Sequence, residues 1–140
     1  MITYVDTSTL LKRLLDEAGS PRADVIWEAA DILASAEILL VEARAALAAA
    51  HRDRRLTTAE LRVAKADLIV LLEEITFVEV TGELIDRAAD LAETEALRGY
   101  DAVHLAAAMA VQANVLTSAD DALCRAAERL GLLVANPLDP

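Results

Sequence analysis

The stretch YVDTSTLLKRLL, residues 4–15, joins two hydrophobic patterns of different period. Its first residues belong to a short apolar run, which predicts a buried strand over 2–6. The leucines that follow recur at helical spacing and predict a helix over 8–17. Asp6 stands at the junction, so the chain places a carboxylate at the end of a buried strand. A buried charge is costly without a partner, and this position therefore indicates a functional group.

The composition is that of one globular domain spanning residues 1–140. No apolar run reaches membrane-spanning length, no signal peptide is recognisable, and Cys124 has no second cysteine to pair with. We therefore expect a cytoplasmic protein that does not enter a membrane. The formal net charge of −11 disfavours nonspecific nucleic-acid binding. It remains compatible with a nucleic-acid enzyme whose acids surround a divalent cation.

Short apolar segments alternate with helical patterns along the rest of the chain. This alternation predicts a three-layer α/β/α domain around a parallel sheet of short strands. The further strands are expected over 37–41 (EILLV), 76–80 (TFVEV), 114–118 (NVLTS) and 132–135 (LLVA), and the further helices over 22–34, 42–53, from Thr57 or Thr58 to about Glu74, from Thr81 to before Gly99, and over 101–112 and 120–130.

Four acids occupy related places in this pattern: Asp6, Glu42, Asp101 and Asp120. Three of them follow predicted strands, and Asp101 begins a predicted helix. Acids also favour the first turn of any helix, and this capping role explains each one taken singly. Capping does not explain why all four should converge on one edge of the sheet. Divalent cations with oxygen ligands would explain it.

The chain resembles the PIN-domain ribonucleases of the VapC type over nearly its whole length. YVDTSTLLK resembles the opening strand of that family with its first acid, and ILLVEARAALAAAHRDRRLT resembles its glutamate-containing helix. GYDAVHLAAAMA and LTSADDALCRAAERLGLLVANP resemble the third and fourth acidic motifs. The resemblance implies a PIN-like fold.

The resemblance also implies the residues of the site. The family's four acids fall on Asp6, Glu42, Asp101 and Asp120, which would bind metal and carry out catalysis. Asp120 fits better than Asp121, because a leucine follows it by three residues as in the family's D-x-x-L. The hydroxyls that would orient the carboxylates are those of Ser8 and Ser118, with Thr117 as an alternative to Ser118.

The implied activity is that of a toxin in a type II toxin–antitoxin system. It would be an endoribonuclease that uses Mg²⁺, or Mn²⁺ in its place, and leaves 5′-phosphate and 3′-hydroxyl ends by attack of an activated water. The alternative is a PIN-fold binding module that acts mainly through its antitoxin, with little or no turnover.

The expected partners are RNA, a VapB-type antitoxin and a second copy of this chain. The one basic region supplies possible RNA contacts, although a solvated helix end explains the same charges. The first two predicted helices carry more apolar residues than one core-facing stripe needs, so an antitoxin helix could pack there, with a basic residue reaching the acids. His104 is expected to be a packed or hydrogen-bonded histidine rather than a ligand. The RNA contacts would be Arg44, Arg52, Arg54 and Arg55, and the antitoxin interface Leu10, Leu11, Leu14, Leu15, Val25, Ile26 and Trp27. Trp27 is compatible with either role, as a core residue or as an anchor for the partner.

Overall fold

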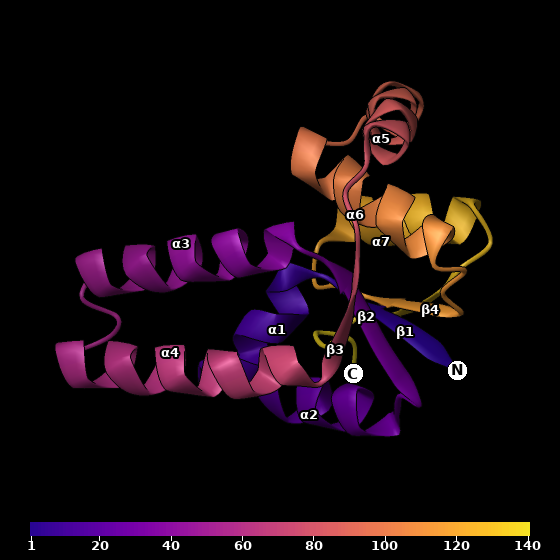
Figure 1. Ribbon diagram of the computed structural model, residues 1–140. Helices are drawn as coiled ribbons and strands as arrows, with labels where there is room; N and C mark the ends of the chain where they lie inside the picture. The colour runs from indigo at the N-terminus through magenta and orange to yellow at the C-terminus, as the bar shows by residue number, and fades with distance from the viewer.

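The computed structural model describes residues 1–140 and contains five strands and seven helices (Figure 1). The strands form one sheet in the order β3-β2-β1-β4-β5, and every neighbouring pair is parallel. The strands are β1 (Ile2–Val5), β2 (Ile32–Ala36), β3 (Ile75–Val78), β4 (Val115–Thr117) and β5 (Leu133–Ala135), and the helices are α1 (Thr7–Leu14), α2 (Ser20–Ala29), α3 (Ile38–Arg52), α4 (Thr58–Glu73), α5 (Gly82–Thr94), α6 (Gly99–Ala110) and α7 (Asp121–Arg129).

The sheet separates two hydrophobic cores, because successive side chains of a strand point to opposite faces. Tyr4 and Ala34 pack into the core beneath α5, α6 and α7. Val5 and Leu33, their direct neighbours in the chain, pack into the core formed with α1, α2, α3 and α4. Figure 1 shows α6 and α7 on one side of the sheet and α1 and α2 on the other. The predicted three-layer α/β/α domain with a short-stranded parallel sheet is therefore confirmed.

The second strand lies earlier in the chain than the sequence pattern predicted. Residues 37–41 do not form a strand; α3 begins at Ile38, and β2 is formed by ILASA, residues 32–36. The helix predicted over 22–34 accordingly ends at Ala29. A short aliphatic run is compatible with a strand and with a buried helix turn, and here the helix is the outcome.

Small residues make β2 suitable for its place beside β1. Ala34, Ser35 and Ala36 are all fully buried, so the helices on both faces can approach closely. The hydroxyl of Ser35 donates a hydrogen bond to the carbonyl of Val5, at 2.7 Å, which satisfies a buried polar group. In the incorrectly predicted strand, by contrast, Val41 is 70% exposed.

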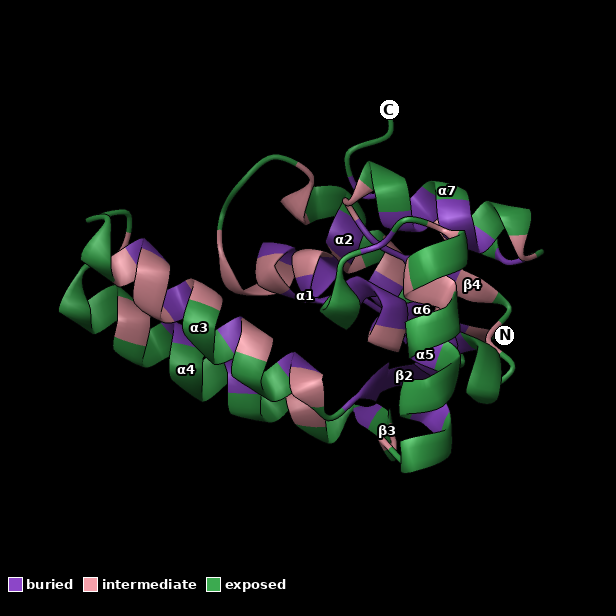
Figure 2. Ribbon diagram, turned by 90° about the horizontal axis from the view of Figure 1, so that it is seen from above, coloured by how far each residue is buried: buried purple, intermediate pink, exposed green.

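Helices α3 and α4 form an antiparallel hairpin that projects from the body of the domain (Figure 1). Its inner face is apolar, with Leu47 and Leu68 fully or almost fully buried, and its outer face is largely exposed (Figure 2). The turn into α4 is fixed by a capping box: the Thr57 hydroxyl accepts from the Glu60 amide at 3.1 Å, and the Glu60 carboxylate accepts from the Thr57 amide at 2.9 Å.

Candidate active site

The four predicted acids line one cleft of about 470 Å³ at the carboxyl ends of the strands. The strand order reverses beside β1, since β2 and β3 lie on one side of it and β4 and β5 on the other. Such a switch point leaves an opening in a parallel α/β sheet. Asp6 directly follows β1, Asp120 follows β4, Asp101 lies in the first turn of α6, and Glu42 lies on α3.

Asp6 is held by hydroxyl groups at the bottom of the cleft. Its Oδ2 atom accepts hydrogen bonds from Ser8 and from Ser118, each at 2.7 Å. The Ser8 hydroxyl also accepts from the amide of Ala119 at 2.9 Å, and Ser118 accepts from the amide of Asp120 at 3.0 Å. This network fixes the orientation of a carboxylate that is only 5% exposed. Both serines thus stand where an orienting group is needed.

The structure places Asp120, and not Asp121, in the cleft. Asp120 is the N-cap residue of α7, and its Oδ1 atom accepts from the amide of Leu123 at 2.9 Å. Asp121 lies in the first helical turn and is exposed.

Glu42 reaches the cleft from the second turn of α3, and not from the end of a strand as predicted. Its Oε1 atom accepts from the hydroxyl of Thr7 at 2.9 Å and lies 2.5 Å from Nε2 of His104. His104 is fully buried, and its Nδ1 atom lies 2.7 Å from the hydroxyl of Tyr4. His104 is therefore hydrogen-bonded within the core, as the sequence predicted.

The proton positions of this group follow from the chemistry of its members. A carboxylate only accepts, so Nε2 of His104 carries the proton shared with Glu42. In the neutral ring Nδ1 then accepts from Tyr4. Burial lowers the pKa of His104, but the hydrogen bond to Glu42 and the nearby carboxylate charges outweigh it, so the pKa is raised overall. The acids thus favour the imidazolium form.

Arg98 is a member of the site that the sequence reasoning missed. It occupies the N-cap position of α6, and its Nε atom donates to Oδ2 of Asp101 at 2.9 Å. Its Nη2 atom donates to Oδ2 of Asp120 at 3.3 Å, so one guanidinium connects two acids. The guanidinium also lies 5.0 Å from the ring centroid of Tyr100. The available signal was an arginine three residues before an acid at a helix start.

The acids influence one another across the cleft. Burial raises the pKa of the Asp101 carboxyl above its usual value, and the charges of Asp6 and Asp120 raise it further, while Arg98 acts in the opposite direction. Like charges in a partly buried cleft are costly, and a bound cation reverses that cost.

The donor chemistry of the cleft fits a hard divalent cation. As the side chains stand, no three acidic, histidine or cysteine groups form a cluster that could hold a metal ion, and Arg98 bridges Asp101 and Asp120. Each of three carboxylates nevertheless has one oxygen that accepts no hydrogen bond within the protein: Oδ1 of Asp6, Oδ1 of Asp101 and Oε2 of Glu42. Carboxylate oxygens are the ligands that Mg²⁺ and Mn²⁺ prefer.

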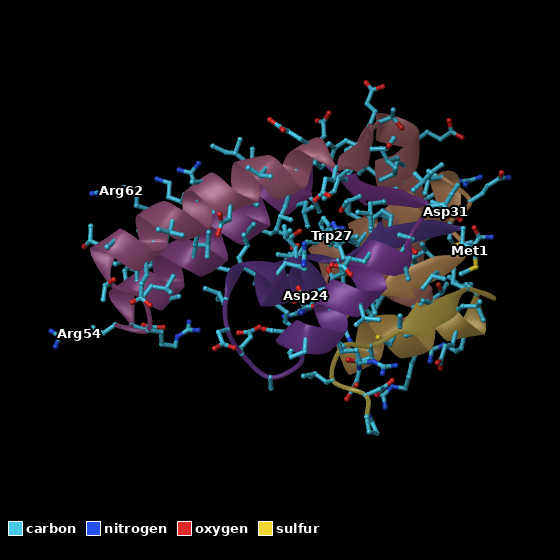
Figure 3. All side chains as sticks on the ribbon, turned by 90° about the horizontal axis from the view of Figure 1, so that it is seen from below. Met1, Asp24, Trp27, Asp31, Arg54 and Arg62 are labelled. Atoms are coloured by element: carbon cyan, nitrogen blue, oxygen red, sulfur yellow. The ribbon has the colours of Figure 1, made fainter.

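The predicted RNA contacts lie at two different distances from the acids. Arg44 is on α3, two residues after Glu42, and is exposed. Arg52, Arg54 and Arg55 are also exposed and lie at the hairpin tip. Arg52 ends α3, about 15 Å further along the helix axis than Glu42 at a rise of ~1.5 Å per residue, and Arg54 and Arg55 lie in the turn that follows. Figure 3 shows Arg54 at the end of the hairpin that points away from the domain.

Two residues of the predicted antitoxin interface belong to the core instead. Leu10 is fully buried and Trp27 is only 4% exposed, so neither offers a free surface. The Trp27 indole donates to Glu74 at 3.2 Å, and the Arg13 guanidinium lies 5.3 Å from its ring centroid. Trp27 packs on α2 in the same core as Leu33 of β2 and Ile75 of β3, so its predicted place on a free interface is wrong. Leu11, Leu14, Leu15 and Ile26 are half-buried, and Val25 is exposed.

An apolar groove of about 540 Å³ separates the end of α1 from the α3–α4 hairpin. Leu14 and Leu15, two of the predicted interface residues, form one wall, and Leu56 and Val63 lie among the residues opposite. Val63 is 60% exposed although it is aliphatic. The groove is thus an uncovered apolar surface that includes part of the predicted interface.

Comparison with known proteins gives agreement in sequence and in fold. A family model described as PIN domain matches residues 3–129. Ribonuclease VapC45 of Mycobacterium tuberculosis (strain CDC 1551 / Oshkosh) is 42% identical over 110 residues, which are 79% of this chain and 76% of that protein. M. tuberculosis VapC20, a Sarcin-Ricin loop cleaving toxin, has a similar structure, with a TM-score of 0.71, 18% identity and coverage of 94% of this chain and 96% of VapC20.

A further similar structure is that of VapBC2 from Rickettsia felis, bound to a DNA fragment from their promoter. The matched chain has a TM-score of 0.66 and 14% identity, and the match covers 97% of this chain and 98% of that one.

Together these findings define the class of protein: the chain belongs to the PIN-domain family. Within that family, its identity to VapC45 places it among the VapC-type ribonuclease toxins of VapBC toxin–antitoxin systems. The resemblance stated from the sequence motifs is thereby confirmed. None of the seven helices combines the length and the apolar character that crossing a bilayer requires.

Proposed function

We propose that this chain is a divalent-cation-dependent endoribonuclease and the toxin of a type II toxin–antitoxin pair that works in the cytoplasm. The observation that carries the proposal is the convergence of Asp6, Glu42, Asp101 and Asp120 on one cleft at the switch point of the sheet. Ribonuclease VapC45 has a related sequence, which supports RNA as the substrate. Hydrolysis of the phosphodiester bond by water would leave 5′-phosphate and 3′-hydroxyl ends.

Each residue of the cleft has a role that follows from its position. Asp6 and Asp101 would hold a Mg²⁺ or Mn²⁺ ion directly, and Glu42 and Asp120 would bind it directly or through water. A bound cation of this kind supplies a water of lowered pKa and compensates charge on the phosphate. Ser8 and Ser118 keep the Asp6 carboxylate aimed at the cleft, since both donate to the same oxygen.

The partners follow from the surfaces around the cleft. The apolar groove between α1 and the hairpin would receive an amphipathic helix of a VapB-type antitoxin, and a basic antitoxin residue would pair with Asp6 or Asp101. VapBC2 of Rickettsia felis, which has a similar fold, was determined as a complex. We also expect two copies of this chain to form a homodimer.

The decisive test is a cleavage assay with purified protein and end-labelled structured RNA. We expect cleavage with Mg²⁺ or Mn²⁺, none after chelation with EDTA, and 5′-phosphate at the new ends. Absence of cleavage under all cation conditions, together with a stable antitoxin complex, would instead indicate a PIN-fold binding module with little or no turnover. Cyclic phosphate ends would contradict attack by water.

A further inference from the structure

Arg98 occupies a place in the cleft that a cation ligand set would otherwise fill. It donates to Asp101 and to Asp120, at 2.9 and 3.3 Å, and lines the same cleft as Asp6. Its guanidinium is thus the positive charge that lies between carboxylates which would repel one another. Removing it would leave these acids with no basic side chain paired to them, because no other arginine or lysine forms an ion pair with Asp101 or Asp120.

The ion pairs of Arg98 with Asp101 and Asp120 lie at the protein surface, where another ligand of the carboxylates can replace the guanidinium. The Arg98 side chain is 62% exposed, whereas that of Asp101 is 9% exposed. An exposed ion pair is worth little free energy, so a ligand that binds the carboxylates can displace the guanidinium. The displaced side chain would stay near the cleft, because Arg98 is the N-cap residue of α6 and the ring of Tyr100, two residues on, offers the guanidinium a face.

We propose that Arg98 has two alternative partners during the reaction. Without a divalent cation it pairs with Asp101 and Asp120 and keeps the acidic cleft closed to other cations. When a cation has taken these carboxylates, Arg98 is released and binds an RNA phosphate at the mouth of the cleft. Guanidinium groups recognise phosphate by the same paired hydrogen bonds that they donate to carboxylates. Arg98 is thus a positioning residue for the substrate, an inference that rests on the proposed function.

The first test measures cation binding without cleavage. Mn²⁺ affinity is determined by electron paramagnetic resonance of free Mn²⁺ for the wild type, for Arg98→Gln and for Arg98→Lys. Loss of the competing guanidinium should tighten Mn²⁺ binding by about threefold to tenfold in Arg98→Gln, because an exposed ion pair no longer has to be broken. Arg98→Lys keeps the charge and should lie between the two. A matched control is Arg129→Gln, since Arg129 is also exposed and paired, with Glu95 at 2.7 Å, but lies outside the cleft.

The second test measures substrate binding. At saturating Mn²⁺, the logarithm of kcat/KM is plotted against the logarithm of salt concentration. Loss of one phosphate contact should reduce the slope by about 0.7 in Arg98→Gln on single-stranded RNA, and Arg129→Gln should keep the wild-type slope. Unchanged or weaker Mn²⁺ binding in Arg98→Gln, or an unchanged slope, would overturn the inference about Arg98. A wild type that binds and cleaves normally would then leave the proposed function intact, whereas a wild type without Mn²⁺ binding would refute both.

Discussion

Nε2 of His104 lies 2.5 Å from Oε1 of Glu42, and this contact connects the acidic cleft to the core of the domain. His104 is fully buried on α6, and its other ring nitrogen is bonded to Tyr4 on β1. The carboxylate on α3 is therefore oriented by two elements of the opposite core. A buried network of this kind is stable only while every member keeps its partner.

Replacing His104 by alanine should therefore reduce both stability and activity. The change leaves the Tyr4 hydroxyl and the Glu42 carboxylate without their shared partner, and we expect a loss of about 1–3 kcal/mol in the free energy of unfolding. Tyr4→Phe is the milder comparison, because it removes one hydroxyl and leaves the contact between His104 and Glu42 in place. Urea unfolding measures the loss of stability in each variant, and the RNA cleavage assay measures the loss of activity. If His104→Ala unfolds at the urea concentration of the wild type, the network does not support the fold.

Asp6→Asn should abolish RNA cleavage while the domain remains folded. The amide keeps the size of the carboxylate and one oxygen for Ser8 and Ser118, but it lacks the charge that a divalent cation needs. Because one of several like charges is removed, the melting temperature without added metal should be equal to or higher than that of the wild type. The control is Asp121→Asn, an exposed acid beside the cleft, which should cleave normally. Full activity of Asp6→Asn would rule out a ligand role.

Added Mg²⁺ or Mn²⁺ should raise the melting temperature of the wild type. The cation binds carboxylates that only the folded chain brings together, so it stabilises the native state. The increase should be smaller in Asp101→Asn, because the cleft then lacks the carboxylate whose Oδ1 atom accepts no hydrogen bond and is free to bind the cation. Differential scanning fluorimetry over a range of cation concentrations gives the comparison. Equal increases in the two proteins would place the cation elsewhere.

The sequence was sufficient for the fold class and for the placement of Asp6, but not for the position of β2. Hydrophobic periodicity identified β1, because a buried aliphatic strand ends sharply at a charged residue. It failed at β2, where three of the five strand residues are small and the neighbouring helix begins with four aliphatic ones. Small side chains are needed in β2 because helices pack on both faces of the sheet. The sequence of one strand does not show that such helices will lie there.

The roles of Arg98 and His104 depend on contacts between distant parts of the chain. His104 meets Glu42 across 62 positions of sequence, and Arg98 meets Asp120 across 22. No local pattern specifies such pairs. Trp27 follows the same rule: its sequence pattern was compatible with the core and with a surface, and its 4% exposure, with contacts to Arg13 and Glu74, places it in the core.

The basic residues of the hairpin should contribute to RNA cleavage according to their distance from the acids. Arg44→Ala should lower kcat/KM more than the double variant Arg54→Ala with Arg55→Ala, because Arg44 lies nearer to Glu42 along α3, although it lines a neighbouring hollow rather than the cleft, and the other two lie at the hairpin tip (Figure 3). Both variants should flatten the salt dependence of cleavage while Mn²⁺ binding stays unchanged. Kinetics at several salt concentrations provide the measurement. Identical kinetics in all three proteins would make these arginines ordinary solvated charges.

The groove between α1 and the hairpin gives the sharpest test of the antitoxin partner. Trp27→Glu is unsuitable, because a charge in the core would unfold the domain whether or not a partner binds there. Val63→Glu is suitable: Val63 lines the groove and is 60% exposed, so the free protein should melt within a few degrees of the wild type.

In coexpression with the small open reading frame beside its gene, the wild type should copurify as a stable complex, and Val63→Glu should weaken that complex at least about tenfold, which corresponds to ~1.4 kcal/mol. Ile85→Glu is the control, since Ile85 is an exposed aliphatic residue on α5 and lies outside the groove. Affinity is measured by titrating purified antitoxin into each variant. If Val63→Glu and Ile85→Glu bind the antitoxin equally well, the groove is not the docking site, because a charge introduced into an occupied apolar groove cannot remain without cost.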